Sequence, residues 1–345
     1  MAWDGVALLE REDATSGARI LIAIHSEALG PATGGTRMKS YPDAEAARAD
    51  AMRLAEGMTY KWAAAGFPRG GGKAVLAVPP DFRAGERPGL LRRYGAFMRE
   101  LGGRFWTGAD VGTSSGDMDV IAEEGAPYVF SRTPGNGGAG DSGTWTAIGV
   151  AASIEAACAR LFGSRSLSGR RVVVQGAGSV GLPLIDILTA QGAEVEFGDV
   201  SPEAGRSLPP AVRRIGADEV YGRPCDVFAP CALGATLNAQ TIPRLACRAV
   251  AGSANNQLST AEDAERLAAR GILYAPDFVV NAGGAVAITG IEALGWTRER
   301  AGREVRAIGE TLDRVFDIAR EAKITPDAAA RRLAEERLTE ASRVR

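Results

Sequence analysis

Two lysines, Lys61 and Lys73, lie twelve residues apart, and three glycines directly precede the second. Successive glycines carry no side chains and open many backbone angles, so we expect a small ligand to lie directly on the backbone there. Burial beside a second ammonium group disfavours the charged form of Lys73 and lowers its pKa. A lysine with a lowered pKa can act as a general base. The alternative is a glycine turn with two solvated lysines, and an isolated Gly-Gly-Gly-Lys does not exclude it.

A carboxylate, Asp110, follows a predicted strand over 104–107. A lone carboxylate in this position is most often a turn or helix cap. A chemical role is also open, because a carboxylate would balance the two lysines and accept hydrogen bonds from a bound ammonium group. Lys61, Lys73 and Asp110 therefore form the first candidate site.

A second candidate site is a glycine-rich turn between a strand and a helix. The apolar run 171–175 predicts a buried strand, Gly-x-Gly-x-x-Gly follows at 176–181, and a helix continues beyond it. The next strand, predicted over 194–198, ends at Asp199, at the spacing of an acid that accepts from a ribose 2′-hydroxyl. This order predicts NAD, with its pyrophosphate at the helix N-terminus. The predicted contacts are Gly176, Ala177, Gly178, Ser179, Val180, Gly181, Asp199 and Val200. The alternative for Asp199 is a solvated acid at a strand end.

The segments around these sites alternate between strand and helix patterns. Strands are predicted over 6–10, 19–25, 74–78, 226–229, 249–252 and 272–274, and helices over 43–57, 88–101 and 144–162. In a parallel sheet, ligands bind at the carboxyl ends of the strands. The loops that follow the later strands are therefore candidate binding segments.

A glycine-rich polar stretch over 135–143 is the clearest linker. We predict an α/β protein with a deep cleft between two domains. The first is an α/β substrate domain over 1–135, and the second is a doubly wound Rossmann domain over 136–310 that binds NAD. Charged helices over 311–345 are expected to pack back on the first domain.

Composition argues against several other classes of protein. The chain has 345 residues, 46% of them hydrophobic, and a net charge of −2, which provides no basic field for nucleic acid. The sequence pattern predicts neither a membrane span nor a signal peptide. The four cysteines show neither metal spacing nor a disulfide framework, so we expect reduced thiols, no metal site and a cytoplasmic location. The single histidine, His25, ends an apolar run and is expected to be structural.

Two longer motifs carry a resemblance to a known family. They are Leu29-Gly-Pro-Ala-Thr-Gly-Gly-Thr-Arg-Met38 and the segment from Met58-Thr-Tyr-Lys61 to Gly-Gly-Gly-Lys73. They resemble the leucine, valine and phenylalanine type of amino-acid dehydrogenase, within the glutamate dehydrogenase superfamily, and the resemblance covers nearly the whole chain. It implies that Lys73 is the catalytic base, that Lys61 binds the substrate carboxylate, and that Asp110 faces the substrate amino group.

The resemblance also extends the predicted sites. The further substrate contacts that it implies are Gly34, Gly35, Met58, Gly108, Asn256 and Asn281. The further cofactor contacts are Thr144, Cys231, Ala232, Leu233, Ala254 and Asn256. The family's members associate, so a homo-oligomer is expected.

The implied reaction is NAD-dependent, reversible oxidative deamination of an L-amino acid to a 2-oxo acid and ammonia. Gly108 favours L-phenylalanine, because family members that prefer aromatic substrates tend to have glycine there and those that prefer leucine or valine tend to have alanine. Leucine, valine or tryptophan as substrate is the alternative. A hydroxy-acid dehydrogenase and a non-catalytic NAD sensor are weaker alternatives: the first needs a base that His25 does not supply, and the second does not explain the intact set of Lys61, Lys73 and Asp110.

Overall fold

The computed structural model describes residues 3–344, which form two compact units. The first contains the chain up to Gly140, Ile288–Trp296 and the chain from Ala334 onward, and the second contains Asp141–Ala287 and Thr297–Leu333. These bounds differ from the predicted ones. Helices α8 (Gly283–Leu294) and α11 (Pro326–Val344) each contribute to both units. Of the segment 311–345, only the part from Ala334 belongs with the first unit, because α10 (Ile308–Ala322) packs against α4 (Ser142–Phe162) in the second.

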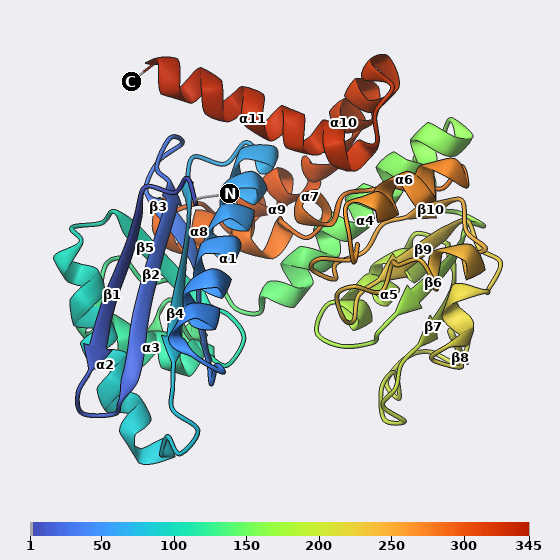
Figure 1. The fold of residues 1–345 in the computed structure, drawn as a ribbon. Helices are drawn as coiled ribbons and strands as arrows, with labels where there is room; N and C mark the ends of the chain where they lie inside the picture. Colours follow the sequence, from blue (N-terminus) through green and yellow to red (C-terminus); the bar gives the residue numbers. More distant parts are fainter. Residues whose placement is uncertain (1–2, 345) are drawn as a thin grey trace. The chain divides into compact units, whose positions relative to one another are not determined.

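The first unit is built on a five-stranded mixed sheet in the order β1-β2-β4-β3-β5 (Figure 1). Its strands are β1 (Ala7–Asp13), β2 (Ala18–Ser26), β3 (Ala32–Lys39), β4 (Gly70–Ala77) and β5 (Phe105–Ala109). β2 is antiparallel to both β1 and β4, whereas β3 runs parallel to β4 and β5. The carboxyl ends of β3 and β5 therefore meet at one edge of the sheet.

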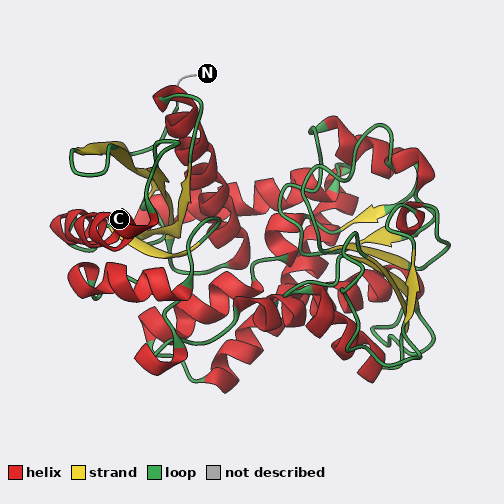
Figure 2. Ribbon diagram, turned by 90° about the horizontal axis from the view of Figure 1, so that it is seen from below, coloured by secondary structure: helices red, strands yellow, loops and turns green. Residues whose placement is uncertain are grey.

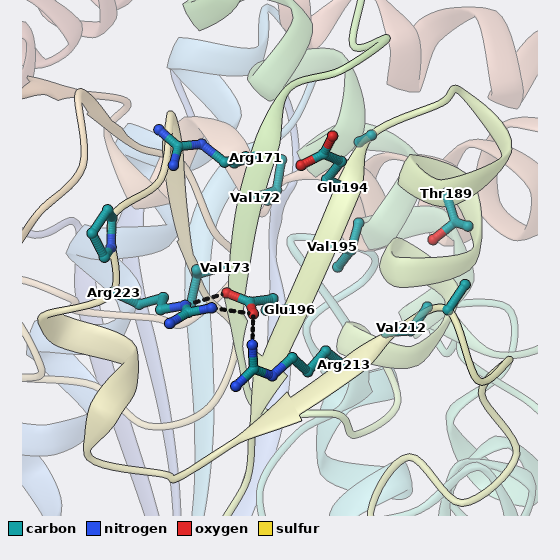
Figure 3. Close-up of a pocket in the computed structure, with 13 residues that line it drawn as sticks. Arg171, Val172, Val173, Thr189, Glu194, Val195, Glu196, Val212, Arg213 and Arg223 are labelled. Atoms are coloured by element: carbon teal, nitrogen blue, oxygen red, sulfur yellow. Dashed lines mark hydrogen bonds and ion pairs between the residues drawn. The ribbon is translucent and has the colours of Figure 1, made fainter.

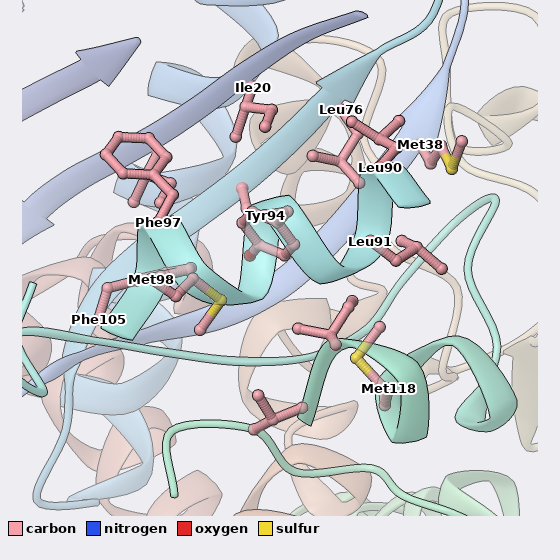
Figure 4. Close-up of a cluster of buried hydrophobic side chains, with 14 of the residues drawn as sticks. Ile20, Met38, Leu76, Leu90, Leu91, Tyr94, Phe97, Met98, Phe105 and Met118 are labelled. Atoms are coloured by element: carbon pink, nitrogen blue, oxygen red, sulfur yellow. The ribbon is translucent and has the colours of Figure 1, made fainter. Parts of the chain in front are cut away.

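Helices cover both faces of this sheet, and β2 shows why. Ile20, Ile22 and Ile24 belong to the core that also includes residues of α2 (Arg87–Glu100) and α3 (Ser115–Gly125). Figure 4 shows Ile20 with Leu90, Tyr94 and Met118 of this core. Leu21 and Ala23 belong to the core that includes buried alanines of α1 (Ala44–Ala65). Successive strand side chains point to opposite faces, so an apolar run buries both.

Two first-unit elements extend beyond the prediction. Helix α1 continues past Gly57 to Ala65, because Thr59, Trp62 and Ala63 bury its last turns, and Lys61 therefore lies on a helix. Strand β4 begins at Gly70, so the three glycines lie in a buried strand and do not form a turn.

The second unit contains a six-stranded parallel sheet in the order β11-β10-β9-β6-β7-β8. Figure 1 labels β6 to β10, and Figure 2 shows strands in yellow. Its strands are β6 (Arg171–Gln175), β7 (Glu194–Gly198), β8 (Arg213–Ile215), β9 (Val227–Pro230), β10 (Ala249–Val250) and β11 (Leu273–Tyr274). The order is that of the doubly wound dinucleotide fold, which confirms the predicted fold class. The short strand β8 was not predicted.

Helices of the second unit pack on this sheet and on each other. They are α4, α5 (Gly181–Ala190), α6 (Glu262–Ala269), α7 (Asp277–Val280), α9 (Arg298–Arg306) and α10. Within residues 3–344 there are also four short 3-10 helices: Ala84–Glu86, Pro134–Asn136, Glu219–Tyr221 and Ile242–Arg244.

Two helical stretches, Ser142–Phe162 and Asp277–Leu294, are long and apolar enough to cross a membrane, which corrects the expectation that no stretch would be. In each stretch, 61% of the most apolar 18-residue segment is buried inside the protein. This is the pattern of core helices, which pass the same length and composition test.

Candidate active site

The three glycines before Lys73 allow close packing around β4. A side chain at Gly71 would overlap Thr59 of α1, whose hydroxyl contacts His25 Nδ1 at 2.8 Å. A Cβ atom at Gly72 would lie 2.8 Å from the Phe105 ring. The glycines are therefore required by neighbouring protein atoms, and the alternative of a glycine turn is wrong, because they lie in a buried strand. That a small ligand lies on this backbone stays a prediction.

Lys73 lies on β4 and forms an ion pair with Asp110, which follows the end of β5. The Lys73 Nζ–Asp110 Oδ2 distance is 3.1 Å, and the lysine side chain is only 6% exposed. The turn after β5 holds Asp110 in place, because its backbone N–H donates to Thr113 Oγ1 at 3.0 Å. The structure thus brings together the two residues that the sequence analysis assigned to catalysis.

A second cation, Arg37 of β3, binds the same carboxylate oxygen. Its Nε donates to Asp110 Oδ2 at 2.9 Å, and its Nη1 donates to Asp50 Oδ2 at 3.1 Å. Asp50 lies on α1 and also accepts from Tyr41 Oη at 2.7 Å. Sequence reasoning gave Arg37 and Asp50 no role. The available signal was strand alternation, which places Arg37 on the same face of β3 as Gly35.

The charges of this cluster follow from burial and pairing. Burial lowers the pKa of Lys73, Asp110 opposes that effect, and the charge of Arg37 lowers the pKa further. Burial raises the pKa of Asp110, but Lys73 and Arg37 outweigh burial and hold it below its usual value. The pair therefore contains an anionic carboxylate and a lysine that loses its proton more readily than a solvated one, as a general base requires.

Gly34 and Gly35 permit close approach to this cluster. A side chain at Gly34 would overlap the backbone oxygen of Gly72, and its Cβ atom would lie 3.3 Å from Met58 Cγ. A Cβ atom at Gly35 would lie 2.8 Å from Asp110 Cβ. Met58 and Lys61 are three positions apart on α1, so they project from the same side of the helix. Four of the predicted substrate contacts thus lie on β3 and α1, the elements that also supply Arg37 and Asp50.

Gly108 does not leave the space that the argument for phenylalanine assumed. A Cβ atom there would lie 2.7 Å from Ser131 Oγ and 2.8 Å from Phe130 Cδ2. Phe130 is only 6% exposed, and its backbone N–H donates to the Thr107 oxygen at 2.8 Å, which fixes it beside β5. The absent methyl group therefore makes room for the protein's own phenylalanine ring, and the volume argument for an aromatic substrate loses its basis.

The glycine loop of the second unit has the three features that a dinucleotide requires. Gly176 has a φ of 91°, which a residue with a side chain rarely adopts. A Cβ atom at Gly178 would meet no atom within 4 Å, so a ligand can approach the backbone there. A side chain at Gly181 would overlap the backbone oxygen of Gly176, where α5 begins against β6. These glycines fit the pyrophosphate of NAD at the N-terminus of α5.

Asp199 follows β7 at the edge of the sheet where the glycine loop lies. Its Oδ2 accepts from the Ala177 N–H and its Oδ1 accepts from the Ser201 N–H, both at 2.8 Å. Each carboxylate oxygen can accept more than one hydrogen bond, so Asp199 can hold the loop and still accept from a ribose hydroxyl. Its negative charge would repel a 2′-phosphate.

Most of the other predicted cofactor contacts lie at this carboxyl edge. Ala232 packs against Gly176, and the Ala254 N–H donates to the Pro230 oxygen at 2.9 Å. Val200 and Leu233 are 90% and 77% exposed. Thr144 is exposed near the start of α4, where Gly143 packs against Ser179 of the glycine loop. Cys231, which follows β9, donates its N–H to the Gln175 oxygen at 2.7 Å.

The predicted asparagines lie beyond β10 and α7. Asn281 is 8% exposed, and its Nδ2 donates to Asn255 Oδ1 at 2.8 Å. Its Oδ1 is buried and has no hydrogen-bond partner in the described part of the chain, so it can accept from a bound ligand. Asn256 is exposed and has a φ of 51°. Its backbone oxygen accepts from the Ala235 N–H at 2.7 Å, so part of its role is to form this turn.

A cavity of about 610 Å³ lies at the opposite edge of the same sheet (Figure 3). It is lined by the first residues of β6 and β7, and in it Arg223 hydrogen-bonds to Glu196 at 2.7 Å. Arg213 lies 3.7 Å from the same carboxylate. Because these charges already pair with one another and the lining comes from the beginnings of β6 and β7, not from their carboxyl ends, it is not the cofactor site.

Comparison with known families gives matches over both parts of the chain. Residues 8–126 match the model described as Glu/Leu/Phe/Val dehydrogenase, dimerisation domain, and residues 203–345 match that of Glutamate/Leucine/Phenylalanine/Valine dehydrogenase. A leucine dehydrogenase from Bacillus cereus is 43% identical over 332 residues, 95% of this chain and 89% of that protein. A valine dehydrogenase from Streptomyces albus is 44% identical over 335 residues, 96% of this chain and 91% of that protein.

Solved structures show the same fold. The L-tryptophan dehydrogenase from Nostoc punctiforme superposes with a TM-score of 0.87 at 38% identity and covers 99% of this chain and 98% of its own. A glutamate dehydrogenase from Thermus thermophilus superposes with a TM-score of 0.78 at 24% identity and covers 98% of this chain and 88% of its own.

Proposed function

Because the chain belongs to the glutamate, leucine, phenylalanine and valine dehydrogenase family and is an NAD-dependent amino-acid dehydrogenase, we propose that its best substrates are the branched-chain amino acids L-leucine and L-valine. The observation that carries the proposal is the identity above 40% to leucine and valine dehydrogenases over nearly the whole chain. The position of Phe130 supports it, because that ring fills the space beside Gly108.

The reaction that we propose converts the amino acid, NAD⁺ and water into the 2-oxo acid, ammonia, NADH and a proton. NAD, when bound, accepts the substrate's α-hydrogen as hydride. Lys61 binds the substrate carboxylate, and Asp110 accepts a hydrogen bond from the substrate nitrogen. Neutral Lys73 removes a proton from the water that attacks the 2-imino acid, and Asp110 carries protons to and from the departing nitrogen.

In the second unit, the loop that Gly176, Gly178 and Gly181 shape would hold the pyrophosphate, and Asp199 would accept a hydrogen bond from the ribose. Thr144 and Asn281 would orient the reacting part of the cofactor and the substrate. The open approach at Gly178 and the unpaired Oδ1 of Asn281 support this assignment. Positioning by these groups would supply much of the rate enhancement.

A second candidate substrate is L-tryptophan, because a tryptophan dehydrogenase shares 38% identity and the fold over nearly the whole chain. The test is kcat/KM with NAD for leucine, valine, phenylalanine and tryptophan. We expect leucine or valine to exceed both aromatic substrates by about 10-fold or more, the scale of discrimination by a packed apolar pocket. A higher value for phenylalanine or tryptophan would reject the branched-chain assignment and retain the family reaction.

We also propose that the protein forms a homo-oligomer through its first unit and resides in the cytoplasm. The match of residues 8–126 to a dimerisation domain supports the first point, and four free cysteines support the second. Light scattering after size-exclusion chromatography tests self-association, and a monomer at micromolar concentration would contradict it.

A further inference from the structure

Asp110 presents one oxygen to two cations. Lys73 Nζ lies 3.1 Å from Oδ2, and Arg37 Nε donates to the same Oδ2 at 2.9 Å. Neither contact uses Oδ1, so this oxygen can accept a hydrogen bond from another group. Arg37 itself is anchored, because its Nη1 donates to Asp50 Oδ2 at 3.1 Å and its side chain is 17% exposed.

We infer that Arg37 is a positioning residue for the Lys73–Asp110 pair. Its guanidinium holds Oδ2 toward the lysine and leaves Oδ1 facing the substrate nitrogen. Its positive charge also weakens the attraction between the carboxylate and the ammonium group of Lys73. The inference rests on the proposed function for the identity of Lys73 as the base. It adds a role for a residue outside the substrate and cofactor contacts.

The physical reason is that a carboxylate alone would keep Lys73 protonated. An opposite charge at 3.1 Å favours the ammonium form, and a general base must be neutral. A second cation on the same oxygen opposes that effect without removing the carboxylate, which is still needed at the substrate nitrogen. Arg37 suits this position because its guanidinium stays charged at every working pH.

The charged groups that act on Lys73 come from three neighbouring elements. β3 supplies Arg37, the turn after β5 supplies Asp110, and α1 supplies Asp50. Asp50 in turn binds Tyr41 Oη at 2.7 Å and Arg53 Nη2 at 2.6 Å. The charge of Asp50 favours the protonated lysine, and the charge of Arg37 disfavours it. Removing the Asp50 charge should therefore lower the pKa of Lys73, and removing the Arg37 charge should raise it.

The experiment is a direct titration of the lysines. The chain has only four lysines, Lys39, Lys61, Lys73 and Lys323, so [ε-13C]lysine labelling gives few NMR signals. Each signal is assigned by substituting one lysine at a time. Arg37→Gln should raise the pKa of Lys73 by about one unit or more. Asp50→Asn should lower it by less, and Arg37→Lys should lie between wild type and Arg37→Gln. Arg53→Gln is the matched control: Arg53 also binds Asp50 but makes no contact with Asp110, and it should cause little change.

The acidic limb of kcat/KM against pH should move with the NMR values in the same variants. A Lys73 pKa that stays at the wild-type value in both Arg37→Gln and Asp50→Asn would overturn the inference. So would a loss of rate that is equal at every pH, because that pattern indicates a structural role only. The NMR titration needs no turnover, so absent activity in the wild type would reject the proposed function and leave the role of Arg37 to be decided by the lysine shifts.

Discussion

The position of Gly108 leads to a prediction about both stability and specificity. In Gly108→Ala, the new methyl group would lie 2.7 Å from Ser131 Oγ and 2.8 Å from Phe130 Cδ2. Phe130 is buried beside β5, so its ring cannot swing into solvent. Overpacking of this kind costs about 1–3 kcal/mol of unfolding free energy. We expect a loss of that size, with lower kcat/KM for leucine and phenylalanine alike.

The assay is urea unfolding of Gly108→Ala, Phe130→Leu and the double variant, with kcat/KM for both substrates. If Phe130 fills the space, the smaller leucine side chain should admit the methyl group, and the double variant should lose less than the sum of the single variants by about 1 kcal/mol. Gly57→Ala is the control, since a Cβ atom there meets nothing within 4 Å and alanine favours a helix. An unchanged stability of Gly108→Ala, with only the ratio of aromatic to aliphatic activity altered, would refute this reasoning.

Two further predictions concern the cofactor and acid stability. Asp199→Asn should raise kcat/KM with NADP relative to NAD by about 10-fold or more, because the charge that repels a 2′-phosphate is removed while one acceptor oxygen remains for the backbone N–H groups of the loop. An equal preference in wild type and variant would contradict this. Arg93 donates hydrogen bonds of 2.6 and 2.7 Å to the carboxylate of buried Asp13 and lowers the pKa of that carboxylate. The ionised form therefore stabilises the fold at neutral pH, and this contribution is lost as the pH falls through the folded-state pKa. Asp13→Asn should therefore lower the unfolding free energy at pH 7 by about 1–3 kcal/mol and reduce its dependence on acid pH, whereas a parallel pH curve would show that Asp13 does not contribute in this way.

The second unit was the more predictable half of the fold. β6 and β7 begin and end where the sequence predicted, because β6 has an apolar centre and β7 alternates polar and apolar residues, each followed by glycine or polar residues. The glycine fingerprint also fixes the position of α5. β8 was missed because it has only three residues, two of them exposed arginines, so no apolar run marks it.

In the first unit, local patterns predicted four of the five strands and two of the helices, but not β3 (Ala32–Lys39), α3 (Ser115–Gly125) or the contacts between elements. Gly57 indicated a helix end, yet it is exposed within α1, and buried residues further along outweigh its cost of about 1 kcal/mol. The glycines before Lys73 left a glycine turn open as an alternative, which the buried strand β4 excludes. Only the tertiary structure shows that Thr59 and Phe105 occupy the space their side chains would need.

The Lys73–Asp110 pair was anticipated from residue type and resemblance, whereas the Arg37 contact was not. It depends on the parallel register of β3 and β5, in which Thr36 lies opposite Ala109. That register brings together residues 73 positions apart in the sequence. A single sequence does not specify such a register, because the same strands could pair in several ways.

The central claim is that Lys73 is the base of an amino-acid dehydrogenase, and its removal tests that claim most directly. The measurement is the initial rate of NADH formation from L-leucine, with ammonia quantified in the same samples, in wild type and Lys73→Ala. NAD affinity is measured alongside by titration. The account predicts equal amounts of NADH and ammonia in the wild type, a kcat lower by about two decades or more in the variant, and unchanged NAD affinity. Near-normal turnover by Lys73→Ala would contradict it.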